Sequence, residues 1–136
     1  MNGMQTAIDK LAWIHVVDGA ILSTRSAGKD TYYIPGGKRE GHETDHQALI
    51  REIKEELSID LIPETLAYVG QFTAQAHGQA TGIEVRMTCY TGAYRGTICP
   101  ASEIVEVRWL RHRDKQLSSP VDRLIFDALH AQGRLE

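Results

Sequence analysis

The chain has 136 residues, 42% of them hydrophobic, with two cysteines and a formal net charge of −3. This length suits one globular domain over residues 1–136, and the interspersed charges form no basic footprint for a long nucleic acid. No apolar run approaches the roughly 20 residues that cross a bilayer, and no secretory signal pattern is present, so we expect a cytoplasmic protein with Cys89 and Cys99 as reduced thiols.

The first predicted elements are a hairpin and a short strand. Residues 11–17 and 20–26 are apolar segments on either side of Asp18-Gly19, a two-residue turn in which glycine tolerates positive φ. Residues 31–35 then predict a short strand that ends at Pro35.

A helix is predicted next. Gly36-Gly37 provides the backbone freedom for a sharp turn, and a loop follows. Thr44 and Asp45 are typical N-cap residues, and the stretch from there to Leu57 lacks Gly and Pro. We expect the helix to stop near Ser58.

The second half of the chain predicts three strands and a closing helix. The strands are expected at 65–75, 82–94 and 103–110, the middle one being rich in β-branched and aromatic residues. Residues 118–133 predict the helix, with Ser119 as its cap. Strands adjacent in sequence with two helices between them indicate the α/β class, with a mixed sheet covered by helices.

Three acids share one face of the predicted central helix. At about 100° per residue, Glu52, Glu55 and Glu56 lie on one arc beside an apolar stripe. A run of charges is commonly a solvated helix face, but like charges at i, i+3 and i+4 repel by about 0.2–0.5 kcal/mol each. Because these acids adjoin the core stripe, we favour a bound cation, and oxygen ligands of this charge suit Mg²⁺ or Mn²⁺.

A different pattern overlaps the same region. The five residues from His42 to His46 spell H-E-x-x-H, the zinc-peptidase motif, in which both histidines lie one turn apart on a helix. His42 instead precedes the expected cap, and no third ligand follows at a recognisable offset. We therefore interpret the match as chance, with both histidines at the surface, and keep a zinc peptidase as the remote alternative.

The segment from Gly37 to Ile59 resembles the Nudix box, G-x5-E-x7-R-E-U-x-E-E-x-G-U, where U is aliphatic. Every defining position matches except Ser58, which replaces the glycine of the left-handed turn after the helix at a cost of about 1 kcal/mol. The segments YYIPGG and EIVEVRWL are also similar to the family's flanking segments. The resemblance implies the Nudix fold, an α/β/α sandwich with a central mixed β-sheet.

The resemblance also implies divalent-metal-dependent hydrolysis of a phosphoanhydride bond in a nucleoside diphosphate linked to another moiety. The metal ligands that it implies are the Gly36 carbonyl, Glu52, Glu55 and Glu56. One of these glutamates, or another from a nearby loop, would deprotonate the water. Arg51 belongs to the implied catalytic set and would pair with Glu43, and Gly37 would support the turn.

A short chain of this kind is most similar to the Nudix enzymes that act on nucleoside triphosphates, so we expect a nucleoside triphosphate or a modified nucleotide as substrate. Nucleotide sugars and dinucleoside polyphosphates are the first alternatives. A non-catalytic nucleotide sensor and an interaction domain with a solvated acidic face are the others, because a fold does not fix a function. The commonest assembly for such a chain is a homodimer.

Four residues outside the box are further candidates. Glu103 and Glu106, on a predicted strand, are candidates for an extra metal ligand or base. His77, in a predicted loop, is a candidate proton shuttle or substrate contact, and Arg25, at the end of the hairpin, is a candidate phosphate contact. Each also has an ordinary explanation as a solvated strand or loop residue.

Overall fold

The computed structural model describes residues 7–76 and 78–136, in which most strands belong to two sheets. The four-stranded sheet has the order β4-β1-β7-β6. Its strands in that order are Gly36–Lys38, Ala7–Trp13, Glu84–Thr91 and Ala67–Gln75. β1 runs parallel to β7, and the other neighbours are antiparallel, which makes this a mixed sheet.

A three-stranded antiparallel sheet has the order β2-β3-β9. It consists of Val16–Val17, Ala20–Ser26 and Ile104–Leu110. A third, two-stranded pair joins β5 (Asp60–Leu61) to β8 (Tyr94–Arg95).

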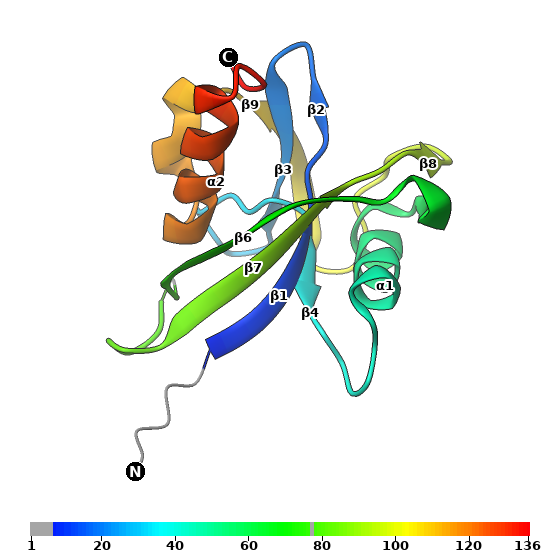
Figure 1. Ribbon diagram of the computed structural model, residues 1–136, viewed down its shortest axis with the longest axis horizontal. Helices are drawn as coiled ribbons and strands as arrows, with labels where there is room; N and C mark the ends of the chain where they lie inside the picture. The colour runs from blue at the N-terminus through cyan, green and yellow to red at the C-terminus, as the bar shows by residue number, and fades with distance from the viewer. Residues whose placement is uncertain (1–6, 77) are drawn as a thin grey trace.

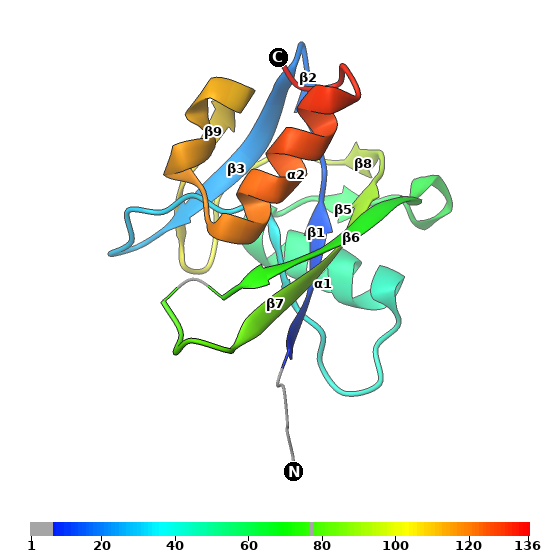
Figure 2. The same cartoon turned by 60° about the vertical axis from the view of Figure 1, so that its left-hand side comes forward.

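The two helices cover opposite sides of the strands (Figures 1 and 2). Helix α1 (Asp45–Leu57) packs into a core cluster that includes Leu11, Trp13, Leu22, Leu49, Ile53 and Leu57. Helix α2 (Pro120–Ala131) packs into a second cluster that includes Ala12, Ile14, Ile21, Met87, Ile125 and Phe126. This arrangement confirms the expected α/β/α sandwich around a mixed sheet. Within the described ranges, no helix is long and apolar enough to cross a membrane.

Helix α1 begins and ends close to the predicted residues. Thr44 is the N-cap, and it forms a capping box with Gln47 that satisfies two backbone N–H groups. At the other end Ser58 has φ 65°, so it adopts the left-handed conformation for which a glycine is usual. The Ser58 hydroxyl donates to the Cys99 carbonyl at 3.0 Å, which partly offsets the strain of a side chain in this conformation.

The first hairpin is confirmed at its turn but is shorter than expected. Asp18 and Gly19 have φ values of 51° and 76°, which is typical of a two-residue turn of type I′. The expected strand over residues 11–17 breaks between β1 and β2, because β1 continues beside β7 while only β2 pairs with β3. One apolar segment therefore serves two sheets.

Two local predictions near the site are wrong. Residues 31–35 form no strand and make only isolated bridges, Tyr33 with Thr24 and Tyr32 with Ser118. Gly36-Gly37 forms no sharp turn and instead starts β4, which pairs with β1. The glycines are needed for close approach, because a Cβ on Gly36 would overlap the Leu11 carbonyl oxygen.

The remaining boundaries also differ from the prediction. Pro63–Thr65 forms the turn η1, so β6 starts later than predicted, and the long strand over residues 82–94 splits into β7 and β8. A second turn, η2 (His112–Leu117), leads into α2. Cys89 is buried and Cys99 is exposed, and both are free thiols.

A carboxyl group is buried at the start of α2. Asp122 is fully buried, and its Oδ2 accepts the Ile34 N–H at 3.0 Å. Burial raises the pKa of Asp122 to about 7, although the Ile34 N–H and the Lys10 charge oppose the shift. The folded state therefore favours the protonated acid, and ionising Asp122 above neutral pH destabilises the protein.

Asp122→Asn should remove this pH dependence. The folded pKa lies above the ordinary value, so the stabilisation is complete at low pH and is lost as the pH rises through about 7. Between about pH 4 and pH 8 the natural protein should lose about 2–4 kcal/mol of unfolding free energy that the Asn variant keeps. Urea unfolding at several pH values measures the difference, and parallel pH profiles for the two proteins would contradict it.

Candidate active site

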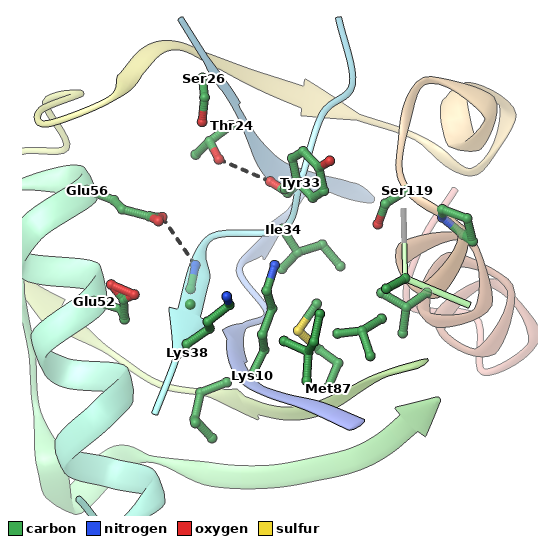
Figure 3. A pocket seen from close by; sticks show the side chains of 18 of the residues that line it. Lys10, Thr24, Ser26, Tyr33, Ile34, Lys38, Glu52, Glu56, Met87 and Ser119 are labelled. Atoms are coloured by element: carbon green, nitrogen blue, oxygen red, sulfur yellow. Dashed lines mark hydrogen bonds between the residues drawn. The ribbon is translucent and has the colours of Figure 1, made fainter. Parts of the chain in front are cut away.

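Two acids of α1 face a pocket at the edge of β4 (Figure 3). Glu56 is only 8% exposed, and its Oε1 accepts the Gly36 N–H at 3.2 Å. Glu52 lies one turn earlier on the helix and lines the same pocket. Helical spacing and the packing of α1 on the core thus hold two carboxylates beside β4, as the sequence predicts.

The electrostatics of this pair favour a cation. Desolvation by burial, with the charges of Glu52 and Glu103, raises the pKa of Glu56 to about 8, although the Gly36 N–H and Lys10 oppose the shift. Burial also raises the pKa of Glu52, with Arg51 opposing and nearby acids adding to the shift. Without a cation the Glu56 carboxyl retains its proton at neutral pH, so a divalent ion would replace this proton when it binds.

The next glycine shapes the site as well. A Cβ on Gly37 would overlap the carboxylate of Glu52, so Glu52 occupies space that only glycine leaves free. At Gly36, by contrast, the added Cβ would overlap a backbone atom, the Leu11 carbonyl oxygen. Gly36 therefore permits β4 to pair with β1, and Gly37 permits a carboxylate to lie over β4.

Arg51 connects the loop before α1 to the acidic face. Its Nε donates to Glu43 Oε2 at 2.7 Å and its Nη2 to Glu43 Oε1 at 3.0 Å, a bidentate pair of the kind expected from the sequence. Nη2 also donates to the Lys38 carbonyl, and Nη1 lies 3.4 Å from both Glu52 and Glu55. The hydrogen bond to Arg51 lowers the pKa of Glu43 to about 2, so this pair stays ionised.

The donor atoms suit Mg²⁺ in kind. The side chains of Glu52 and Glu56 are largely buried at the pocket, whereas that of Glu55 is 53% exposed and contacts Arg51. Across residues 7–76 and 78–136, no three His, Cys, Asp or Glu side chains are already arranged to hold a metal ion. Side-chain rotation on a fixed helix would bring these oxygens together, which is compatible with a hard cation that keeps several waters.

The acids lie at one end of a pocket of about 440 Å³. Its walls combine apolar residues with two lysines, and they include Ile8, Lys10, Ile34, Lys38, Val85, Met87 and Val121. Figure 3 shows the side chains of Lys10 and Lys38 beside Glu52 and Glu56. A pocket of this size, apolar at one end and charged at the other, is in the range of small-molecule binding sites.

Lys10 and Asp122 were missed by reasoning from the sequence. On β1, Lys10 lies between Ile8 and Ala12, whose side chains pack with the core cluster of α2, so a charge interrupts an apolar alternation. On α2, Asp122 occupies the buried stripe with Ile125 and Phe126. A charged residue at an otherwise apolar position was the available signal in both cases.

The four candidates outside the box have different positions. Glu103 lines the pocket, and its Oε2 accepts the Ser102 hydroxyl at 2.6 Å. Glu106 Oε1 instead accepts from Arg25 Nε and the Tyr32 hydroxyl, both at 2.8 Å, so Arg25 and Glu106 bind each other. The hydrogen bond from Arg25 lowers the pKa of Glu106. His77 lies outside the described residues.

The H-E-x-x-H residues do not lie together on a helix. His42 lies in the turn before Thr44, and α1 begins at Asp45. His46 is in the first turn of α1, where its ring meets Tyr90 edge-on at 5.2 Å. Glu43 binds Arg51. The geometry that the zinc motif requires is therefore absent at these residues.

His46→Ala should leave hydrolysis within a few-fold of the natural rate, because the His46 ring contacts Tyr90 and does not line the acidic pocket. Steady-state rates with and without added Mg²⁺ test this. A collapse in rate together with loss of bound zinc would revive the peptidase interpretation.

Comparisons with known proteins agree with this fold. A family model described as the NUDIX domain matches residues 10–127. The solution structure of the Escherichia coli ORF135 protein is similar, with 27% identity, a TM-score of 0.75, and coverage of 95% of this chain and 92% of that chain. No curated protein matches the chain.

Two further structures are similar in fold. A MutT NUDIX hydrolase from Burkholderia pseudomallei is 22% identical over 90% of this chain and 97% of that chain, with a TM-score of 0.74. A UDP-X diphosphatase is 15% identical over 97% of this chain and 66% of that chain, with a TM-score of 0.70. At these identities the likeness concerns the fold alone.

Proposed function

The chain belongs to the NUDIX family and is a Nudix-type pyrophosphohydrolase, and we propose that it hydrolyses a nucleoside triphosphate or modified nucleotide with Mg²⁺, or Mn²⁺, as its cofactor. One observation supports this most. The acids Glu52 and Glu56 and the lysines Lys10 and Lys38 line the same pocket, whose remaining wall is largely apolar. This arrangement supports the proposal, because carboxylates that could hold a metal and amines that could bind phosphate adjoin an apolar surface that could hold a nucleoside.

In this proposal Glu52, Glu55, Glu56 and the Gly36 carbonyl hold the metal. A bound Mg²⁺ supplies the positive charge that phosphoanhydride cleavage needs. Arg51 orients the acidic face through its bidentate pair with Glu43. Lys10 and Lys38 act as point charges on phosphate oxygens of the substrate.

The proton of the attacking water needs an acceptor. One of the three glutamates of α1, or Glu103 on the facing loop, takes this proton as the water oxygen bonds to phosphorus. The phosphoanhydride P–O bond breaks, and the leaving phosphate keeps the electron pair. Glu103 is a candidate because it lines the pocket and its charge raises the pKa of both Glu52 and Glu56.

Hydrolysis of a substrate panel tests the proposal. The panel contains nucleoside triphosphates, oxidised nucleotides, nucleotide sugars and dinucleoside polyphosphates, each with Mg²⁺, Mn²⁺ or EDTA. We expect metal-dependent cleavage of a triphosphate, with products resolved to show which phosphorus is attacked. No turnover on any substrate by folded protein that binds Mg²⁺ would favour the non-catalytic sensor instead.

Nucleotide sugars are the second candidate substrates. A protein of similar fold is a UDP-X diphosphatase, so uridine diphosphate compounds belong among the substrates to compare. A nucleotide sugar must place both a base and a sugar in the pocket, so preference for this class would appear as a higher kcat/KM than for the matching triphosphate.

A further inference from the structure

Strand β9 is the outer strand of its sheet, and its free edge is the basis of this inference. In the described part of the chain it pairs only with β3. The Leu22 N–H donates to His15, and Thr24 exchanges hydrogen bonds with Tyr33, so both residues direct their backbone groups away from β9. Their register partners on β9 are Trp109 and Val107.

Because antiparallel pairs alternate between bonded and non-bonded residues, Val107 and Trp109 direct their N–H and C=O groups outward. Val105 differs, because a β-bulge shifts the register between Arg25 and Ser26 and turns the Val105 N–H toward β3. Over residues 7–76 and 78–136, Val107 and Trp109 form no backbone hydrogen bond with a segment other than β3. Such an edge is a template for another strand.

The side chains along this edge are unusual for a solvated strand. Val105 is 52% exposed and Trp109 is 44% exposed, and both lie on the same face of β9 as the half-buried Val107. The opposite face carries Glu106 and Arg108. Apolar residues on one face and opposite charges on the other are not the repulsive pattern that usually protects an edge.

We propose that β9 pairs with β9 of a second copy of this chain, antiparallel, about a two-fold axis at Val107. In this register Val107 faces the partner's Val107, and Val105 faces the partner's Trp109. The outward backbone groups of the two Val107 residues then hydrogen-bond across the axis. A two-fold interface requires a surface that is complementary to itself, and this strand meets that condition.

Charge complementarity favours the same register. Glu106 lies opposite the partner's Arg108, in a non-bonded pair where side chains approach most closely. Among the residues that the structure describes, both hydrogen bonds to Glu106 use Oε1, so Oε2 is available for a cation. Arg108 lies over the Tyr32 ring at 5.7 Å, and within the described residues it forms no salt bridge. The symmetric interface therefore contains two Glu–Arg pairs.

Arg108→Glu tests the pairing, because it places two glutamates opposite the partner's Glu106 residues. Sedimentation velocity over a range of protein concentrations should show a dimer whose dissociation constant rises about tenfold or more in this variant. Arg95→Glu makes the same charge change at an exposed position on β8 and should leave the dimer unchanged. Circular dichroism verifies that each variant is folded.

Hydrogen exchange of the natural protein tests the same interface without a mutation. The amide of Val107 should gain protection as protein concentration rises, while the amide of Arg108, which pairs with β3, should not depend on concentration. A monomer at every concentration, a dimer that both variants weaken equally, or exchange at Val107 that ignores concentration would each overturn the proposal.

Discussion

Glu56→Gln should lower the turnover number by about 10²–10⁴-fold while leaving the fold intact. Glutamine has nearly the shape of glutamate, and its carbonyl oxygen still accepts the Gly36 N–H that Oε1 accepts now. What the variant loses is a negative charge at the most deeply buried acid of the pocket. Because charge and not shape changes, a loss of activity reports on the cation and the proton acceptor.

The same substitution should stabilise the protein when no metal is present. The folded pKa of Glu56 is about 8, above its ordinary value, so the stabilisation from the protonated acid is complete at low pH and is lost as the pH rises through about 8. Glutamine does not ionise. In EDTA near pH 8.5 the variant should therefore exceed the natural protein by roughly 2–5 kcal/mol, a difference that largely disappears near pH 5.

With added Mg²⁺ the natural protein should become more stable than the Glu56→Gln variant. A cation that binds only the folded state raises the unfolding temperature of the natural protein, and the variant should gain much less. Thermal unfolding in EDTA and in Mg²⁺, beside steady-state rates, measures all three effects. Glu64→Gln, at an exposed position on η1, is the matched control and should change none of them. An active Glu56→Gln enzyme would refute the role proposed for this residue.

The sequence was sufficient for the elements with a strong local signal. Helix α1 was predictable because Thr44 begins it, its apolar stripe is unbroken, and Ser58 ends it at the expected residue. The grouping of Glu52 with Glu56 followed from the same spacing. Short-range periodicity and capping decide these features, so one sequence contains the needed information.

Features that depend on distant contacts were not predictable. The break between β1 and β2 occurs because β1 finds a parallel partner in β7, more than seventy residues away, and no local pattern marks this. Glu103 and Glu106 look equivalent on a strand, yet only Glu103 lines the pocket, because Glu106 binds Arg25 and Tyr32. Tertiary context separates two residues that the sequence treats alike.

The adjacent glycines Gly36 and Gly37 should respond to alanine in opposite ways. Gly36 has φ 149°, a conformation that side chains rarely adopt, and a Cβ there would overlap the Leu11 carbonyl oxygen in the facing strand. Neither the Gly36 backbone angle nor the position of the Leu11 carbonyl can change without opening the β1–β4 pairing. Gly36→Ala should therefore cost about 3–5 kcal/mol of unfolding free energy, in the range of the most damaging single substitutions.

Gly37→Ala should spare the fold and damage the site. The atom that its Cβ would meet is the end of the Glu52 side chain, which rotates at small cost. The displaced carboxylate is one of the proposed metal ligands, so the Mg²⁺ concentration for half-maximal activity should rise about tenfold or more while the unfolding midpoint changes little. Urea unfolding and Mg²⁺ titrations of both variants separate the two effects. Equal destabilisation by the two substitutions would show that Gly37, like Gly36, is needed for strand pairing and not for the position of Glu52.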